Sequence, residues 1–198
     1  MVASIAMLAA VLAFAPVVMG APDVYRVEPG MTSVEFGVSH LGISRQRGTF
    51  DQTWGRIELD GPRATGSIDF VVDAASVNTG WSVRDAFIRG EDMFDVEQFP
   101  VMRFRSTRLD FDAGRLRAID GDLTLHGVTR EVAFAVTRLD CGSDPATGRA
   151  GCGAEATGTI RRSDFGMSYA LPLIGDEIDL RFLVTAFAVP PRGEADTY

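Results

Sequence analysis

Lysine, histidine and cysteine, which often carry out catalysis or bind metals, are absent or scarce in this chain. All 19 basic residues among its 198 are arginine, so no lysine is present for Schiff-base chemistry or for a phosphate-binding loop. The chain has only two histidines, His40 and His126, and two cysteines, Cys141 and Cys152. A closed zinc site built from cysteine and histidine would require all four to converge. The inventory therefore argues against several classes of enzyme and against a structural zinc site.

No common catalytic motif is present either. The sequence lacks a G-x-S-x-G elbow, an H-E-x-x-H pair, a P-loop and a G-x-G-x-x-G turn after a predicted strand. A Ser-His-Asp triad stays open, because its members need not be adjacent in sequence. The acidic cluster at residues 91–97 fits no calcium-loop spacing, and we interpret it as a solvated face. The net charge of −8, with no basic stretch, argues against a nucleic-acid partner, and we expect no cofactor.

Residues 1–20 are predicted to be a secretory signal peptide. Eighteen of the first 21 residues are apolar, and Val18 and Gly20 fit cleavage after Gly20, with cleavage after Ala21 as the alternative. The segment lacks a basic start, which leaves an uncleaved membrane anchor as the other interpretation, although Pro16 makes its apolar core short for an anchor. We expect a mature domain over residues 22–189, without a membrane span, and a flexible tail over residues 190–198.

The two cysteines bracket a stretch rich in glycine and proline, CGSDPATGRAGC, between two strand-like segments. In an exported domain, such a pair predicts a disulfide between Cys141 and Cys152. A bridge that closes a loop of this size stabilises the fold by about 3 kcal/mol in the loop-entropy model. The alternative is two free thiols.

The elements that must position these side chains are mostly strands. Apolar and polar residues alternate with a period of two, as in residues 34–39 and 178–184, and about eight such segments follow one another with short connections. One or two short helical insertions interrupt them, at residues 81–89 behind a possible Thr79 N-cap and at residues 163–167. A meander of this kind predicts an all-β, antiparallel, up-and-down barrel of eight strands, because closure removes the sheet edges.

The interior of an eight-stranded barrel is either filled by side chains or holds one small ligand. Five phenylalanines lie on the apolar faces of predicted strands, so we expect them to point inward: Phe36, Phe70, Phe104, Phe134 and Phe182. They either line a ligand cavity or form a plain core. His40 continues the parity of Phe36 and Val38, so it either meets a ligand head group or bonds within the fold.

Eight stretches of the chain, in order, resemble the YceI-like family. They are YRVEP (25–29), SVEFGVSH (33–40), GTF (48–50), SVNT (76–79) with Arg84-Asp85, FDVEQFPVMRFRS (94–106), GDLTLHGVT (121–129), RSDFGM (162–167) and GDEI (175–178). Each stretch is short, but together they cover nearly everything between Tyr25 and Ala188. The Cys141–Cys152 bridge is not part of the family pattern.

The resemblance implies a lipocalin-like barrel in the bacterial periplasm that binds a polyisoprenoid or a related long-chain lipid. With the strand parity, it predicts an apolar lining of Phe36, Val38, Phe70, Phe104, Leu123, Phe134, Phe165, Met167 and Phe182. His40, Arg84 and Arg162 are the expected contacts of the polar head.

Three functions follow from these expectations. The first is a non-catalytic carrier that shelters a long-chain isoprenoid lipid from water by apolar burial. The second is an enzyme that acts on an isoprenoid or quinone-type lipid in the same cavity, with His40 as acid and base. The third is a packed, ligand-free interaction module, for which a homodimer is one form.

Overall fold

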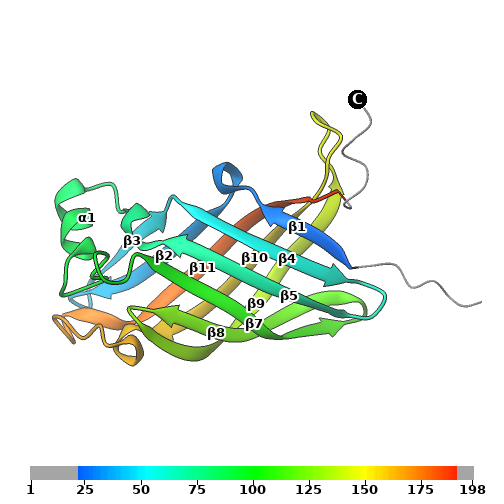
Figure 1. Cartoon of the computed structure of the whole chain (residues 1–198). Helices are drawn as coiled ribbons and strands as arrows, with labels where there is room; N and C mark the ends of the chain where they lie inside the picture. The colour runs from blue at the N-terminus through cyan, green and yellow to red at the C-terminus, as the bar shows by residue number, and fades with distance from the viewer. Residues whose placement is uncertain (1–21, 191–198) are drawn as a thin grey trace, which may run out of the picture.

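The computed structural model describes residues 22–190, so the predicted leader and most of the predicted tail lie outside the described residues. The described chain forms one antiparallel sheet and a single α-helix, α1 (Ser82–Arg89) (Figure 1). The strands are β1 (Asp23–Val27), β2 (Ser33–His40), β3 (Ser44–Phe50), β4 (Thr53–Asp60), β5 (Thr65–Asp73), β6 (Val77–Asn78), β7 (Val101–Asp112), β8 (Arg115–Leu125), β9 (Val128–Ser143), β10 (Ala150–Arg161) and β11 (Ile174–Ala188). Three 3-10 turns complete the fold: η1 (Pro29–Met31), η2 (Ala74–Ser76) and η3 (Arg162–Phe165).

Eight of these strands close into a barrel. Their order is β1, β4, β5, β7, β8, β9, β10 and β11, and β1 pairs with both β4 and β11, which closes the ring. Strands β2, β3 and β6 continue β1, β4 and β5 beyond short interruptions. The predicted all-β, antiparallel, eight-stranded, up-and-down barrel is therefore confirmed.

The first three barrel strands are each broken once, and hydrogen bonds secure the breaks. At the break between β1 and β2, the Thr32 hydroxyl donates to the Thr185 carbonyl at 3.3 Å and accepts from the Thr185 amide at 3.2 Å. Between β3 and β4, the Gln52 carbonyl accepts from the Asp73 amide at 3.0 Å. The ladder therefore continues where the strands bend, and few backbone groups lose a partner.

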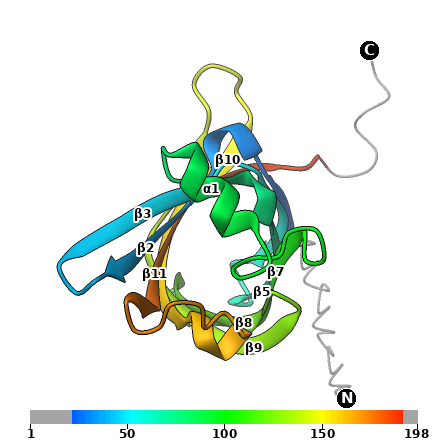
Figure 2. The ribbon, with the colours of Figure 1, turned by 90° about the vertical axis from the view of Figure 1, so that its left-hand side faces the viewer.

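The breaks open one end of the barrel, and α1 lies across that end (Figure 2). Strand β6 pairs with β3, whereas β7 pairs with β5, so the chain between Asn78 and Val101 crosses from one side of the opening to the other. The predicted Thr79 N-cap is wrong: the helix begins after Trp81 without a side-chain cap. Thr79 instead donates from its amide, at 2.8 Å, and from its hydroxyl to the buried Asp85 carboxylate.

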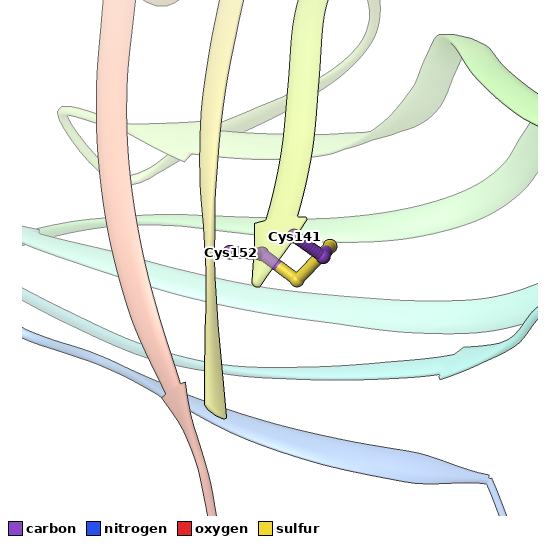
Figure 3. Close-up of a disulfide and its surroundings, with 2 residues drawn as sticks. All are labelled: Cys141 and Cys152. Atoms are coloured by element: carbon purple, nitrogen blue, oxygen red, sulfur yellow. A yellow bond between two sulfur atoms is a disulfide. The ribbon is translucent and has the colours of Figure 1, made fainter. Parts of the chain in front are cut away.

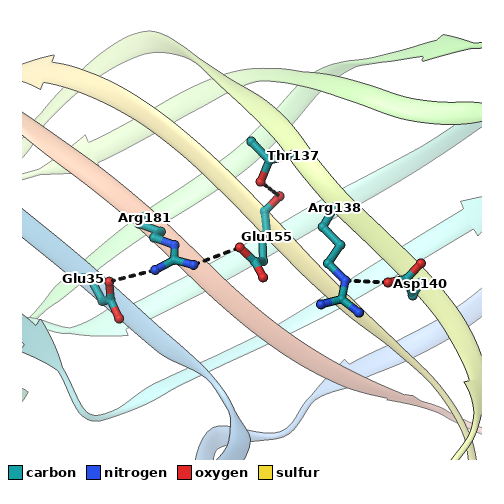
Figure 4. Close-up of polar contacts among 6 residues, drawn as sticks. All are labelled: Glu35, Thr137, Arg138, Asp140, Glu155 and Arg181. Carbon is teal, nitrogen blue, oxygen red and sulfur yellow. Dashed lines mark hydrogen bonds and ion pairs between the residues drawn. The ribbon is translucent and has the colours of Figure 1, made fainter.

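The outer face of the barrel carries the polar half of the alternating pattern (Figure 4). Arg181 on β11 lies 3.0 Å from Glu155 on β10 and 3.7 Å from Glu35 on β2, so one guanidinium bridges three adjacent strands. Arg138 and Asp140 pair farther along, on β9. These pairs are exposed, so each contributes only about 0–1 kcal/mol, and they serve mainly to keep this face hydrated.

Arg162 is the most deeply buried charged residue in the described part of the chain, and it holds the chain around η3. Its side chain is 2% exposed, and its nitrogens donate to the backbone carbonyls of Gly175, Met167, Tyr169 and Ile174 at 2.8–2.9 Å. Burial lowers the pKa of the guanidinium, but the ordinary pKa of arginine is so high that the group stays charged. One side chain therefore fixes the segment that leads from η3 into β11.

A disulfide joins Cys141 on β9 to Cys152 on β10, where the two residues are direct cross-strand partners (Figure 3). The bridge lies beside the β9–β10 turn, at the end of the barrel opposite α1 (Figure 1). The predicted bridge is therefore present, and it closes the turn between two strands that already pair.

Replacing Arg162 with methionine is expected to lower the free energy of unfolding by about 3 kcal/mol or more, because four carbonyls lose a charged donor. Urea unfolding measures the loss. Arg162→Lys is the matched variant. It keeps the positive charge, but its ammonium has three N–H donors on one nitrogen in place of five on three, so its stability should be intermediate. A methionine variant as stable as the wild type would contradict this role.

Removing the disulfide with a Cys141→Ala, Cys152→Ala double variant is expected to lower the free energy of unfolding by up to about 3 kcal/mol. Because the bridge lies at the end opposite α1, the space inside the barrel at the α1 end should be unchanged. Urea unfolding and binding of an apolar fluorescent probe test the two statements. Loss of probe binding in a folded double variant would show that the bridge shapes the interior.

Candidate functional site

A cavity of about 580 Å³ occupies the barrel interior at the α1 end. It is lined by Val34, Phe36, Val38, His40, Gln46, Arg47, Phe50, Phe70, Val72, Thr79, Trp81, Val83, Arg84, Phe87, Ile88, Met93, Phe94, Met102, Phe104, Leu123, Leu125, Phe134, Ile160, Arg162, Met167, Ile174, Ile178, Leu180 and Phe182. The exposed side chains of Trp81, Val83 and Phe87 belong to this lining, so the cavity reaches the solvent beside α1. We call this opening the mouth.

The structure brings most of the predicted lining together. Eight of the nine predicted apolar residues face the cavity: Phe36, Val38, Phe70, Phe104, Leu123, Phe134, Met167 and Phe182. The exception is Phe165, which is 1% exposed and packs in the core cluster without facing the cavity. It lies in η3, outside the strand alternation, so parity could not place it. That the eight residues contact a ligand stays a prediction.

Many lining residues had a usable signal in the sequence. Val72 shares the parity of Phe70 on β5, Met102 that of Phe104 on β7, and Leu180 that of Phe182 on β11, so alternation alone points to them. The residues from α1 and the turns after it, such as Phe87, Met93 and Phe94, had none. They come from a segment whose position over the mouth is set by tertiary contacts.

Arg84 on α1 is the best-placed cation at the mouth. Its guanidinium donates to the Gln46 side-chain oxygen at 2.5 Å, to the Thr79 hydroxyl at 2.8 Å and to the Thr79 carbonyl at 2.7 Å. It also lies 5.8 Å from the centre of the Trp81 ring. An arginine has five N–H donors, so these bonds use only part of its capacity. Arg84 is therefore held in place with donors to spare.

The position of Arg84 depends on Asp85, which is buried beneath it. The Thr79 hydroxyl and amide both donate to the Asp85 carboxylate, and these bonds hold the pKa of Asp85 below its usual range. The carboxylate in turn fixes Thr79, which accepts from Arg84. Asp85 therefore helps to hold the mouth in place.

The other two predicted polar contacts differ from Arg84. His40 lies at the end of β2 and faces the cavity, where the strand parity placed it. Arg162 also borders the cavity, but its nitrogens are committed to four backbone carbonyls. Arg162 therefore supports the cavity wall. That His40, Arg84 and Arg162 contact the polar head of a ligand stays a prediction.

Exposed apolar side chains gather around the mouth. They come from the β2–β3 turn, from α1 and from the segment before β11: Leu41, Ile43, Trp81, Val83, Phe87, Tyr169, Leu171 and Leu173. The three segments touch, because the Phe87 and Tyr169 rings lie 5.2 Å apart and the Leu41 amide donates to the Leu173 carbonyl at 2.7 Å. Apolar groups thus continue from the cavity to the outside of this end.

Within residues 22–190, no three histidine, cysteine or acidic side chains gather where they could hold a metal ion. No helix in this part of the chain has the length and apolar character needed to cross a membrane.

Comparison with known proteins identifies relatives for both the sequence and the fold. Residues 25–186 match the model of the YceI-like domain. A UPF0312 protein from Pseudomonas fluorescens is 38% identical over 184 residues, which cover 90% of this chain and 92% of that protein. Among solved structures, the fold is similar to that of BcnA from Burkholderia cenocepacia, with a TM-score of 0.70 at 21% identity, over 80% of this chain and 98% of that one.

A second solved structure with this fold is a polyisoprenoid binding domain from Saccharophagus degradans. Its TM-score is 0.63 at 20% identity, over 83% of this chain and 98% of that one. At such identity the likeness concerns the fold alone. The domain match and the Pseudomonas relative extend over nearly the whole barrel, including the strands and turns that line the cavity. The chain therefore belongs to the YceI-like family.

Proposed function

We propose that this chain is a periplasmic binding protein that holds a polyisoprenoid or similar long-chain amphiphilic lipid inside its barrel, without transforming it. The observation that carries the proposal is the cavity of about 580 Å³, most of whose lining residues are apolar. Ligand pockets typically have volumes of about 300–1,000 Å³ and are mainly apolar with a few placed polar groups. A cavity of this size argues against the alternative that the barrel is a packed, ligand-free interaction module.

The distribution of polar groups favours an amphiphile over a plain hydrocarbon. His40, Gln46, Arg47, Thr79 and Arg84 all belong to the lining, and Thr79 and Arg84 belong to the segment that carries α1 over the mouth. Farther in, the lining consists of aliphatic and phenyl groups such as Phe104 and Phe134. A molecule with a polar head at the mouth and a hydrocarbon tail inside matches both regions.

Two further observations support the ligand class and the location. The Saccharophagus neighbour with this fold is described as a polyisoprenoid binding domain, and an isoprenoid tail needs the apolar shelter that this barrel offers. Residues 1–20 read as an export signal, and the disulfide between Cys141 and Cys152 fits an oxidising compartment such as the periplasm.

The proposal is tested by native mass spectrometry of protein purified from a periplasmic extract. We expect one long-chain lipid per protein, and reloading of the emptied protein with an added prenyl alcohol. Val38→Glu places a carboxylate in the apolar cavity, so affinity should fall at least about tenfold. Ser39→Glu is the matched control, because the next residue on β2 is exposed and should leave binding unchanged.

Absence of a bound lipid, together with no uptake of added prenyl alcohol, would overturn the proposed function. Recovery of a chemically altered lipid, with the alteration lost in His40→Ala, would instead contradict its non-catalytic part. In a carrier, His40→Ala should change affinity at most.

Arg84→Gln tests the polar end of the site. The variant should lower affinity for a prenyl diphosphate about tenfold or more, because bonds between a charged donor and an anion each contribute about 1.5–3 kcal/mol. Affinity for the uncharged prenyl alcohol of the same chain length should change little. Arg138→Gln, on the outer face, is the control. Equal losses for both ligands would mean that Arg84 only shapes the mouth.

A further inference from the structure

The barrel interior contains a second apolar space beyond the cavity already described. It measures about 100 Å³ and lies toward the disulfide end, where Cys152, Leu116 and Ile119 belong to its lining. Tyr25 is the only lining residue with a hydroxyl group. We call the larger space the main chamber and this one the far chamber.

Four phenylalanines separate the two chambers. Among residues 22–190, only Phe70, Phe104, Phe134 and Phe182 line both spaces. They come from β5, β7, β9 and β11, which are four of the eight barrel strands. We call this set the phenylalanine septum.

The four rings touch in a continuous chain. The Phe70 and Phe182 centroids are 6.1 Å apart, those of Phe182 and Phe134 are 4.9 Å apart, and those of Phe134 and Phe104 are 5.4 Å apart. The planes of each pair are tilted by 69–87°, the edge-to-face arrangement that aromatic rings favour. The septum is therefore a packed layer across the interior.

Glycines on neighbouring strands make room for three of the rings. A Cβ atom on Gly158 would lie 2.5 Å from the Phe134 ring, and one on Gly121 would lie 2.5 Å from the Phe104 ring. A Cβ atom on Gly55 would lie 3.2 Å from the Phe70 ring, which is close but less restrictive than the other two contacts. With no side chain at these positions, the rings lie against the adjacent strands and meet at one level of the barrel.

We propose that the phenylalanine septum is the end-stop of the lipid site and sets the longest hydrocarbon chain that the barrel encloses. This inference rests on the proposed function. A chain that enters at the mouth runs through the main chamber and meets the septum. Isoprene units beyond that length stay at the mouth, in contact with water, and add little affinity. The far chamber is apolar space that the chain reaches only when a septum ring is shortened.

The test measures the binding of prenyl alcohols of increasing length to the wild type and to Phe134→Leu, by native mass spectrometry. Phe134 is chosen because it contacts two other septum rings. We expect wild-type affinity to rise with length and then level off. In the variant, the plateau should move one or two isoprene units longer, and affinity for the longest chains should rise about tenfold because more apolar surface leaves water. If Phe134→Leu does not fold, Phe70→Leu is the second variant that shortens a ring of the septum.

Two control variants test whether the septum, and not a general increase in cavity volume, sets the length at which affinity levels off. Phe50→Leu enlarges the main chamber alone, since Phe50 does not line the far chamber, so the plateau should stay at the wild-type length. Ala156→Leu fills the far chamber, and in the Phe134→Leu background it should restore the wild-type limit.

The outcomes test the septum proposal separately from the proposed function. A wild type that takes up no prenyl alcohol of any length overturns the proposed function, and the septum proposal with it. A wild type that binds these alcohols, while both septum variants keep its length profile, overturns the septum proposal alone. A plateau that shifts equally in Phe50→Leu would also contradict the septum.

Discussion

Closure of the sheet is the constraint on which the other features depend. Strand β1 bonds to β4 on one edge and to β11 on the other, so the eight strands of the ring leave no free edge and acquire an inside. Once the ring is closed, the strand period of two sends alternate side chains into one enclosed volume. At eight strands that volume is just large enough either to be filled by side chains or to hold one small ligand. In this barrel, side chains fill the interior at one level, and a cavity is present at another.

The distribution of large and small residues decides where the interior is full. Phenyl groups meet at the level of Phe70, Phe104, Phe134 and Phe182, and glycines on adjacent strands give three of them room. Toward α1, the strands are interrupted, β6 pairs with β3 while β7 pairs with β5, and the cavity lies at this level. The cavity is therefore a consequence of strand geometry as much as of residue size.

At the α1 end of the barrel, buried charged side chains hold the backbone in place through hydrogen bonds. Arg162 joins four carbonyls around η3, and Asp85 fixes Thr79, which in turn orients Arg84. A buried charge without such partners would be costly, so these bonds are the condition for placing it there. The two ends of the barrel differ as a result. One carries a disulfide between β9 and β10, next to the turn that joins them, and the other is assembled from separate segments whose exposed apolar groups surround the mouth.

Much of the architecture followed from the sequence alone, because alternation is a local signal. The parity of Phe36, Phe70, Phe104, Phe134 and Phe182 placed all five rings inside the barrel, and the spacing of Cys141 and Cys152 fitted the bridge. Local signals could not place Phe165, whose 3-10 turn has no period of two and which packs in the core. They also could not show that the Arg162 side chain donates to backbone carbonyls before β11 and at its start. The sequence by itself determined which side chains of the regular strands face inward. Only the tertiary structure decided which of them touch and which leave empty space, because that depends on strands far apart in the chain meeting at one level of a closed barrel.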